Sequence, residues 1–292
     1  MNTAANTLSF DQLHIDIGRN ASDDFNPFHD PQRWRNVRRN PFSGPIVLGF
    51  QLECLIAACV ERYRDSNAET ALIAELGLRY SCYEFRFVSA VLPGQRLRIE
   101  VQPGQVKKGA SVQLSNRVRL FCNDQLAVTG YKRESRSPLY LQELHNTAPA
   151  NLAIAQDRDY LPDSAWFLKR KYLTTSNAKN FLCASLVEQT RYIDEIAEKV
   201  DFPEMFPCAL ISNALLERAW RDGHDFEAQP MIYLAHRLCC DRVAVAGMRS
   251  NAALHILTRP SSDAAGLTQF DALGVLGADQ TLFQGRIDLQ AL

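Results

Sequence analysis

Residues 45–63 carry apolar side chains around nearly the whole circumference of a helix, and no other segment constrains the fold as much. A helix that is apolar on all sides must be buried on all sides, so the rest of the chain has to surround it. Ser43 and Gly44 supply a loop before this segment, and Pro45 suits a first helical turn. Charged residues return at Glu61 and mark the end of the buried part.

The sequence after this helix alternates between strand-like runs and turn residues. Strand candidates lie at residues 76–88, 95–101, 111–122 and 125–131, separated by Pro-Gly, Lys-Gly and Asn-Asp pairs. Leu97, Ile99 and Val101 alternate with charged residues, as in a strand with one buried face. This order predicts an α+β domain in which a curled antiparallel sheet wraps around a long central helix.

The same order of elements returns in the second half of the chain. An apolar helix is predicted at residues 207–220, and strand candidates follow at 231–239, 242–248, 252–258, 269–275 and 281–289. Matching landmarks are 162 residues apart for Pro45 and Pro207, 163 for Ala21 and Ala184, and 155 for Gly130 and Gly285. Such nearly constant spacing favours an internal duplication. We therefore predict two fused domains, at residues 1–140 and 159–292, joined by a polar linker at 141–158.

Charge and cysteine spacing exclude several classes of function. The chain has 32 Lys and Arg residues against 33 Asp and Glu, without a long basic run, which argues against nucleic acid as the main partner. We expect no membrane span and no signal peptide, because apolar runs are too short and the first residues lack a basic flank. The eight cysteines form no Cys-x-x-Cys pair, so no metal site is expected. Together these features predict a cytoplasmic protein.

A polar segment before the first helix contains Asp-Phe-Asn-Pro-Phe-His at residues 24–29. Pro27 stiffens the turn between Asp24 and His29, so the carboxylate and the imidazole can converge on one small volume. Such a pair can hold a water molecule and move its proton near neutral pH. The pattern predicts acid–base chemistry at Asp24 and His29.

Residues 21–29, Ala-Ser-Asp-Asp-Phe-Asn-Pro-Phe-His, closely resemble the signature of the MaoC-like dehydratases, the (R)-specific enoyl-thioester hydratases of the hotdog fold. Residues 43–50 resemble the start of that family's central helix, and residues 85–97 resemble its strand–turn–strand element. The resemblance spans about the first 135 residues. With the predicted duplication, it implies a double hotdog, in which each of two fused domains has a central helix wrapped by an antiparallel sheet.

The resemblance also implies a hydro-lyase reaction and a role for each matching residue. The reaction is the reversible hydration of an enoyl thioester, or dehydration of a 3-hydroxyacyl thioester, by syn addition of water. Asp24 and His29 would activate the water, while Asn26 and Pro27 would support the turn. The backbone N–H of Gly49, at the positive end of the central helix, would bind the carbonyl oxygen on which charge develops. No cofactor is expected, because the thioester itself acidifies the α-proton.

The second half of the chain lacks this signature. The spacing of 163 places Val187 opposite Asp24 and Tyr192 opposite His29, and the spacing of 162 places Ile211 opposite Gly49. We expect a catalytically inactive domain that completes the sheet-to-sheet pairing and forms one wall of the acyl pocket.

The expected partner is an acyl thioester, carried by coenzyme A or by an acyl carrier protein in fatty acid metabolism. Arg35, Arg38 and Arg39 form a basic cluster after the signature, which is either a solvated face or a contact for the phosphates of the carrier. A homodimer of two double hotdogs is left open. Asp23 and Leu48 depart from the family pattern, which has Gly and His there. A non-catalytic acyl-thioester-binding or scaffold subunit therefore remains an alternative, as does a hotdog thioesterase.

Overall fold

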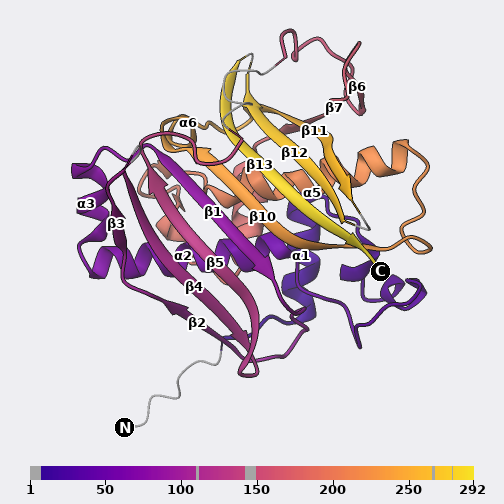
Figure 1. The fold of residues 1–292 in the computed structure, drawn as a ribbon, viewed down its shortest axis with the longest axis horizontal. Coiled ribbons are helices and arrows are strands. Elements are labelled where there is room, and N and C mark those ends of the chain that lie inside the picture. The colour runs from indigo at the N-terminus through magenta and orange to yellow at the C-terminus, as the bar shows by residue number, and fades with distance from the viewer. Residues whose placement is uncertain (1–7, 110–111, 142–148, 265–266, 278) are drawn as a thin grey trace.

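Helices pack against one large antiparallel sheet in this chain (Figure 1). The computed structural model describes residues 8–109, 112–141, 149–264, 267–277 and 279–292. Its helices are α1 (Gln12–Ser22), α2 (Gly49–Ser66), α3 (Glu69–Glu75), α4 (Thr175–Ala184), α5 (Met205–Arg221) and α6 (Arg242–Ala246), with short 3-10 turns η1 (Pro27–His29), η2 (Arg33–Asn36) and η4 (Gln189–Arg191). Its strands are β1 (Tyr80–Phe87), β2 (Leu97–Val101), β3 (Gln105–Lys107), β4 (Gln113–Cys122), β5 (Gln125–Ser135), β6 (Asp159–Tyr160), β7 (Phe167–Tyr172), β8 (Ile193–Asp194), β9 (Lys199–Val200), β10 (Met231–Asp241), β11 (Ala253–Ala264), β12 (Leu267–Leu276) and β13 (Gln280–Ala291). The mixed helical and antiparallel class predicted from the sequence is confirmed.

The strands of the two halves meet at a single seam. The order in the large sheet is β2-β4-β5-β1-β10-β13-β12-β11-β7-β6, and β3 pairs with β4 outside this path. Strands β1 and β10 pair antiparallel from Tyr80 opposite Asp241 to Arg86 opposite Ala235. One continuous sheet therefore spans both halves, while β8 and β9 form a small separate ribbon.

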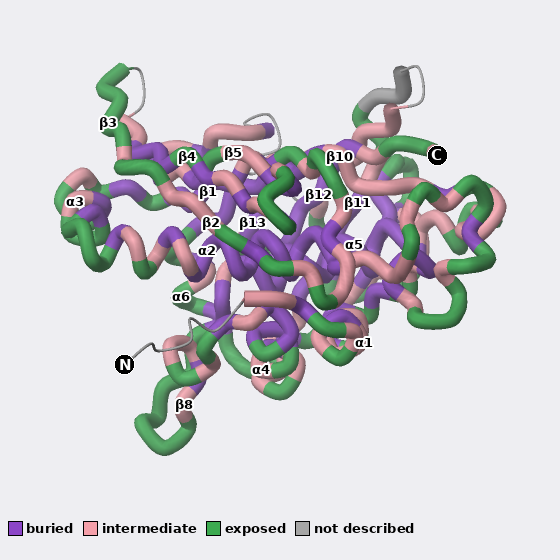
Figure 2. The backbone as a smooth tube through the Cα atoms, turned by 90° about the horizontal axis from the view of Figure 1, so that it is seen from below, coloured by how far each residue is buried: buried purple, intermediate pink, exposed green. Residues whose placement is uncertain are grey.

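The central helices α2 and α5 lie beneath the sheet, and α1 and α4 lie beneath them in turn (Figure 2). The first ten residues of α2 are all buried, which agrees with an apolar surface on every side. One apolar cluster contains Ile56 from α2 and Ile211 from α5, so the core is continuous across the two halves. Burial of such side chains, at about 25 cal/mol per Å² of apolar surface, is the main force that holds the halves together.

Helix α2 begins at Gly49, four residues later than the sequence predicts. Residues just before it are bonded to other segments: the Ile46 N–H donates to Phe28 O at 3.0 Å and the Val47 N–H to Val91 O at 2.8 Å. These bonds keep the segment out of the helix and hold it beside η1. The segment therefore packs against the turn that carries His29.

The two halves repeat the same local structure at a spacing of 163 residues. Asp23 follows α1 with a left-handed φ of 52°, and Leu186 follows α4 with a φ of 58°. The Asp24 N–H donates to Arg19 O, and the Val187 N–H donates to Leu182 O in the same way. This agreement confirms the pairing of Asp24 with Val187 that the sequence spacing predicts.

Two segments differ from the prediction. Residues 242–248, predicted as a strand, contain α6 instead, because Asp241 caps a helix by accepting a hydrogen bond from the Val243 N–H at 3.0 Å. Residues 69–75, within a stretch without a predicted element, form α3. The division into domains at residues 140 and 159 stays a prediction, and residues 142–148 of the expected linker lie outside the described part of the chain.

Candidate active site

The segment from Asp24 to His29 folds into two successive tight turns. Asp24 Oδ1 accepts a hydrogen bond from the Asn26 N–H at 3.0 Å, and Asn26 Oδ1 accepts one from the Phe28 N–H at 3.1 Å. Pro27 occupies the first position of η1, where a missing N–H costs nothing. The short polar side chains and the proline thus determine the turn locally.

This turn brings Asp24 and His29 together inside the protein. Asp24 Oδ2 and His29 Nε2 are 4.0 Å apart, and the two residues are 3% and 4% exposed. His29 Nδ1 lies 2.7 Å from Ile46 O, so this nitrogen carries the proton and Nε2 is left as an acceptor that faces Asp24. A gap of 4.0 Å is too long for a direct hydrogen bond, but it allows one water molecule to contact both groups.

Burial determines the protonation state of His29. Loss of hydration lowers the pKa of His29, and the positive charge of Arg19 lowers it further. The Asp24 carboxylate and the carbonyl of Ile46 act in the opposite direction without overcoming burial. The imidazole is therefore neutral at pH 7 and can accept a proton.

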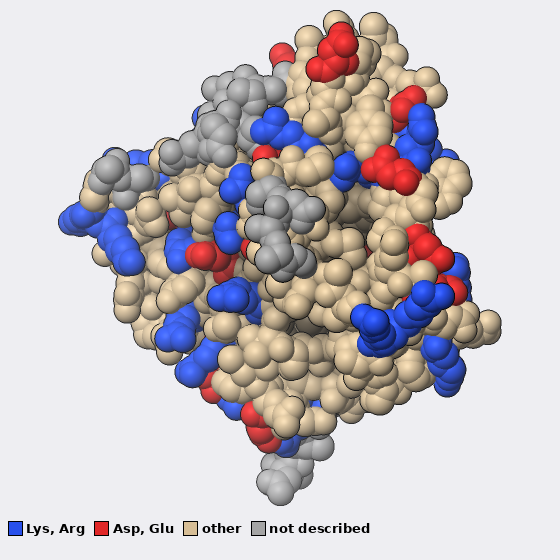
Figure 3. Space-filling view, turned by 45° about the vertical axis from the view of Figure 1, so that its right-hand side comes forward, with Lys and Arg blue, Asp and Glu red and all other residues tan. Residues whose placement is uncertain are grey.

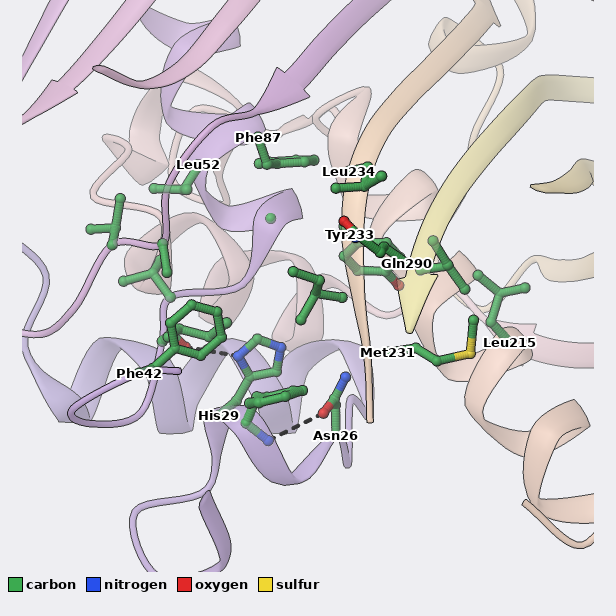
Figure 4. A pocket seen from close by; sticks show the side chains of 18 of the residues that line it. Asn26, His29, Phe42, Leu52, Phe87, Leu215, Met231, Tyr233, Leu234 and Gln290 are labelled. Atoms are coloured by element: carbon green, nitrogen blue, oxygen red, sulfur yellow. Dashed lines mark hydrogen bonds between the residues drawn. The ribbon is translucent and has the colours of Figure 1, made fainter. Parts of the chain in front are cut away.

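An apolar cavity of about 310 Å³ opens beside His29 (Figure 4). Both halves of the chain contribute to it, and its wall opposite His29 comes from α5, β10 and β13. Leu215 and Met231, which the sequence assigns to this wall, do line it. The cavity, called the apolar cavity below, is lined by Asn26, Phe28, His29, Phe42, Ile46, Val47, Gly49, Leu52, Phe87, Val88, Ser89, Ala90, Val91, Leu215, Leu216, Ala219, His224, Phe226, Met231, Ile232, Tyr233, Leu234, Leu289 and Gln290.

Gly49 lies at the edge of the apolar cavity as the first residue of α2. An N–H at this position has no acceptor within the helix and lies at the positive end of the helix dipole. A Cβ on Gly49 would be only 3.0 Å from Cζ of Phe87 and 3.6 Å from Cε1 of His236. Glycine therefore allows Phe87 to pack closely against this helix start.

Gln51 fixes the start of α2 relative to both halves. Its side chain is fully buried, and Oε1 accepts a hydrogen bond from the Leu48 N–H at 3.2 Å. Its Nε2 donates to His14 O on α1 at 2.9 Å and to Ala184 O on α4 at 3.0 Å. The role of this residue was not predicted, although a single glutamine in an apolar helix was a signal.

The fold of this chain has similar counterparts among solved structures. No family model and no curated protein sequence matches the chain. Among solved structures, it is similar to a MaoC-like dehydratase (TM-score 0.62, 11% identity, 98% of this chain and 96% of that one). The fold is that of the MaoC-like dehydratases.

Two further structures agree with this assignment. A Mycobacterium tuberculosis protein described as having a double hotdog fold is similar at a TM-score of 0.61 and 12% identity, over 99% of this chain and 94% of the other. A putative MaoC domain protein dehydratase from Chloroflexus aurantiacus is similar at a TM-score of 0.59 and 8% identity, over 98% and 93%.

In this MaoC-like fold Ile211 is not the counterpart of Gly49 in the second half, so that expectation was wrong. Helix α5 begins at Met205, so Met205 takes the position of Gly49, and Ile211 lies further along the helix. The spacing misleads because the connection from η4 to α5 is shorter than that from η1 to α2. Pro45 precedes its helix, whereas Pro207 lies within the first turn of α5.

A charged residue stands at the start of α5 instead. Glu204 accepts hydrogen bonds from Ser81 and from the Tyr83 hydroxyl at 2.6 Å, and Lys132 Nζ lies 3.8 Å away. Burial raises the pKa of Glu204, but Lys132 and the two hydroxyls outweigh it and lower the pKa below its usual value. A carboxylate at this helix start would repel a developing oxyanion. The inactivity that we predict for this half would therefore have a second cause, besides the missing signature.

The basic cluster lies outside the apolar cavity. Arg35, Arg38 and Arg39 are exposed, and Arg35 donates to Pro31 O at 3.2 Å. The Arg38 N–H donates to Glu227 O at 2.8 Å, close in sequence to His224 and Phe226 of the cavity lining. On the face shown in Figure 3, Lys and Arg side chains lie in several separate groups, some of them next to acidic side chains. A role of this cluster in phosphate binding stays a prediction.

Two kinds of feature are absent from the described residues. No cluster of three or more His, Cys, Asp or Glu side chains in that part of the chain is arranged to hold a metal ion. No helix within it combines the length and apolarity needed to cross a membrane.

Proposed function

We propose that the protein catalyses the reversible hydration of enoyl thioesters to 3-hydroxyacyl thioesters, as a double hotdog whose first half carries the chemistry. The observation that carries this proposal is the buried pair of Asp24 Oδ2 and His29 Nε2, 4.0 Å apart beside an apolar cavity. The fold shared with MaoC-like dehydratases supports it.

A water molecule between the two side chains would be the nucleophile. It can donate one hydrogen bond to His29 Nε2 and one to the Asp24 carboxylate, which leaves a lone pair of its oxygen free. In hydration this oxygen bonds to carbon 3, while one of its protons passes to the pair. A proton from the same pair is then added to carbon 2, so both additions occur on one face of the double bond.

Gly49 would stabilise the charge that forms during this reaction. Electrons of the double bond move to the thioester carbonyl as the water oxygen attacks, and an enolate oxygen results. The Gly49 N–H at the start of α2 is aligned with the helix dipole and would bind this oxygen. The enolate is stabilised by the thioester and by this N–H, so the proposed step requires neither a metal ion nor a redox group.

The apolar cavity would hold the acyl chain. Its lining includes Leu52 and Phe87 from the first half and Leu215 from the second, so both halves would determine chain length. Each methylene buried there contributes about 0.8 kcal/mol. The carrier would be coenzyme A or an acyl carrier protein in fatty acid metabolism, with Arg35, Arg38 and Arg39 as candidates for its phosphates. The cytoplasmic location and the homodimer stay predictions.

One assay tests this proposal against its alternatives. The purified protein is incubated with crotonyl-CoA and with longer enoyl-CoAs, and the loss of enoyl absorbance and the release of free thiol are followed together. A hydratase lowers the absorbance without releasing thiol, a thioesterase releases thiol, and a binding or scaffold subunit does neither. The Asp24→Asn variant is the control, because it keeps the shape of the site and removes the carboxylate.

A further inference from the structure

A second, polar cavity of about 500 Å³ lies on the other side of Asp24. Its walls come from the end of α1 and the following loop, and from β7 and α5 of the second half. Among the described residues, Asp24 lines this polar cavity and not the apolar one, whereas His29 lines the apolar cavity and not the polar one. The Asp24–His29 pair therefore separates two cavities of different character.

Asn213 of α5 lines this cavity and carries an unsatisfied buried polar atom. The residue is 2% exposed, and its Nδ2 donates to Asp23 O at 2.9 Å, next to Asp24. Within the described part of the chain, Asn213 Oδ1 and Arg19 Nε are buried without a hydrogen-bond partner, and both residues line the cavity. A free acceptor and a free donor in a roomy polar cavity are the partners that a buried water molecule needs.

The charges around the cavity argue against an anion as its occupant. Lys171 pairs with Asp23, Lys169 Nζ lies 3.1 Å from Glu217, and Arg158 donates to Glu217 at 2.7 Å. Arg19 is paired with Asp30 at 2.9 Å. Each of these cations already faces a carboxylate. The groups that still lack a partner, one donor and one acceptor, therefore suit a neutral ligand that can both donate and accept a hydrogen bond.

The proposed reaction, on which this inference rests, needs a supply of water. In hydration the acyl chain fills the apolar cavity, so a water molecule cannot enter past it. We propose that the polar cavity is the water chamber of the site, and that Asn213 is a positioning residue that holds a water molecule against Asp24. The second half thus contributes to the chemistry through Asn213 and not only as a wall.

Substitution of Asn213 tests the positioning role. The Asn213→Leu variant keeps the number of side-chain heavy atoms and the branching at Cγ but neither donates nor accepts, and it should lower kcat for crotonyl-CoA hydration about tenfold, the effect of one lost hydrogen bond. KM should stay within about twofold, because the apolar cavity is untouched. Asn213→Ser, whose hydroxyl can still bind water, should recover most of kcat. Asn180→Leu, at an exposed position of α4, is the matched control and should behave like the wild type.

Crystal structures provide a readout that does not depend on activity. The wild type should show ordered water within hydrogen-bond distance of Asn213 Oδ1, and Asn213→Leu should lack it while Asp24 stays in place. A dry cavity, an ion at Oδ1, or an unchanged kcat in the folded Leu variant would overturn the inference. If the wild type hydrates no enoyl thioester, the proposed function fails and the catalytic role of this water fails with it, while the crystal structures still decide whether the chamber binds water. Should the Leu variant not fold, the Ser variant and the wild-type crystal decide.

Discussion

Replacing Gly49 by alanine should lower the activity and leave the stability of the fold nearly unchanged. Alanine is about 1 kcal/mol more favourable than glycine in a helix, so Gly49→Ala gains intrinsic helix stability. The new Cβ would lie 3.0 Å from Cζ and 3.3 Å from Cε1 of Phe87, below the roughly 3.5–4.0 Å of a relaxed carbon contact. Phe87 is only half-buried at the end of β1, so its ring can move outward by a few tenths of an ångström. We expect the two effects on folding to nearly cancel.

The effect on the reaction should be much larger. In the proposed reaction the thioester oxygen approaches the Gly49 N–H, and a methyl group at this position would narrow that approach from the side of Phe87. A substrate displaced by about 1 Å can lose roughly 10²-fold in rate. We therefore expect kcat/KM for crotonyl-CoA to fall between about 10-fold and 10²-fold, with an unfolding midpoint close to that of the wild type.

The measurement compares initial rates and thermal unfolding of the two proteins side by side. Gly109→Ala is the control, because a Cβ there meets no atom within 4 Å. If Gly49→Ala retained more than half of kcat/KM, the close approach of substrate to this N–H would be refuted. A large drop in the unfolding midpoint would instead mean that the contact with Phe87 destabilises the fold and that the activity is lost for this reason.

Five further predictions concern other parts of the structure. Asp24→Asn and His29→Ala should each lower hydration by a factor of about 10² or more, and near-normal rates in either variant would remove that residue from the acid–base pair. Because burial lowers the pKa of His29 below its usual 6.5, the acid limb of the kcat/KM profile should lie below pH 6.5, and a limb above it would contradict a neutral buried imidazole. The same shift means that His29 contributes to falling stability as the pH drops below about 6.5, where the unfolded chain binds the proton first, which urea titrations at several pH values would measure. Leu215→Ala should shift the preference toward longer or branched acyl chains, and an unchanged chain-length profile in the folded variant would leave this wall without a role in specificity. Glu53→Leu should destabilise the fold by about 1–3 kcal/mol, since it leaves the fully buried imidazole of His236 without its hydrogen-bond partner at 3.1 Å, and chemical denaturation that shows no loss of stability would argue against a contribution from this bond.

The parts of the fold that local sequence determines were predictable. The helix at α2 follows from its apolar circumference, and the turn at Asp24 follows from short polar residues and Pro27. The spacing of Ala21 and Ala184 also identified Val187 correctly as the counterpart of Asp24. These features depend on neighbours in the chain, which a sequence displays directly.

What depended on distant contacts was not predictable. Residues 242–248 alternate like a strand, but the cap at Asp241 and its pairing with Arg79 across the seam favour a helix. The match of Ile211 to Gly49 failed because a shortened loop changed the spacing between the halves. Asn213 looked like part of an apolar helix, and only the folded chain shows that it lies next to Asp23. Its amide within an apolar run was the one signal available.

Joining the two halves in one chain changes how the apolar cavity responds to dilution. His29 from the first half and Leu215 from the second line this cavity, and β1 pairs with β10 between the halves. A cavity shared by separate subunits would be lost below their dissociation constant, by mass action. Within one polypeptide the partner is present at an effective concentration of about millimolar or more, set by the connecting segment and independent of the amount of protein. Specific activity should therefore be the same at nanomolar and micromolar enzyme, and a cell could make very few copies of this protein without losing the site.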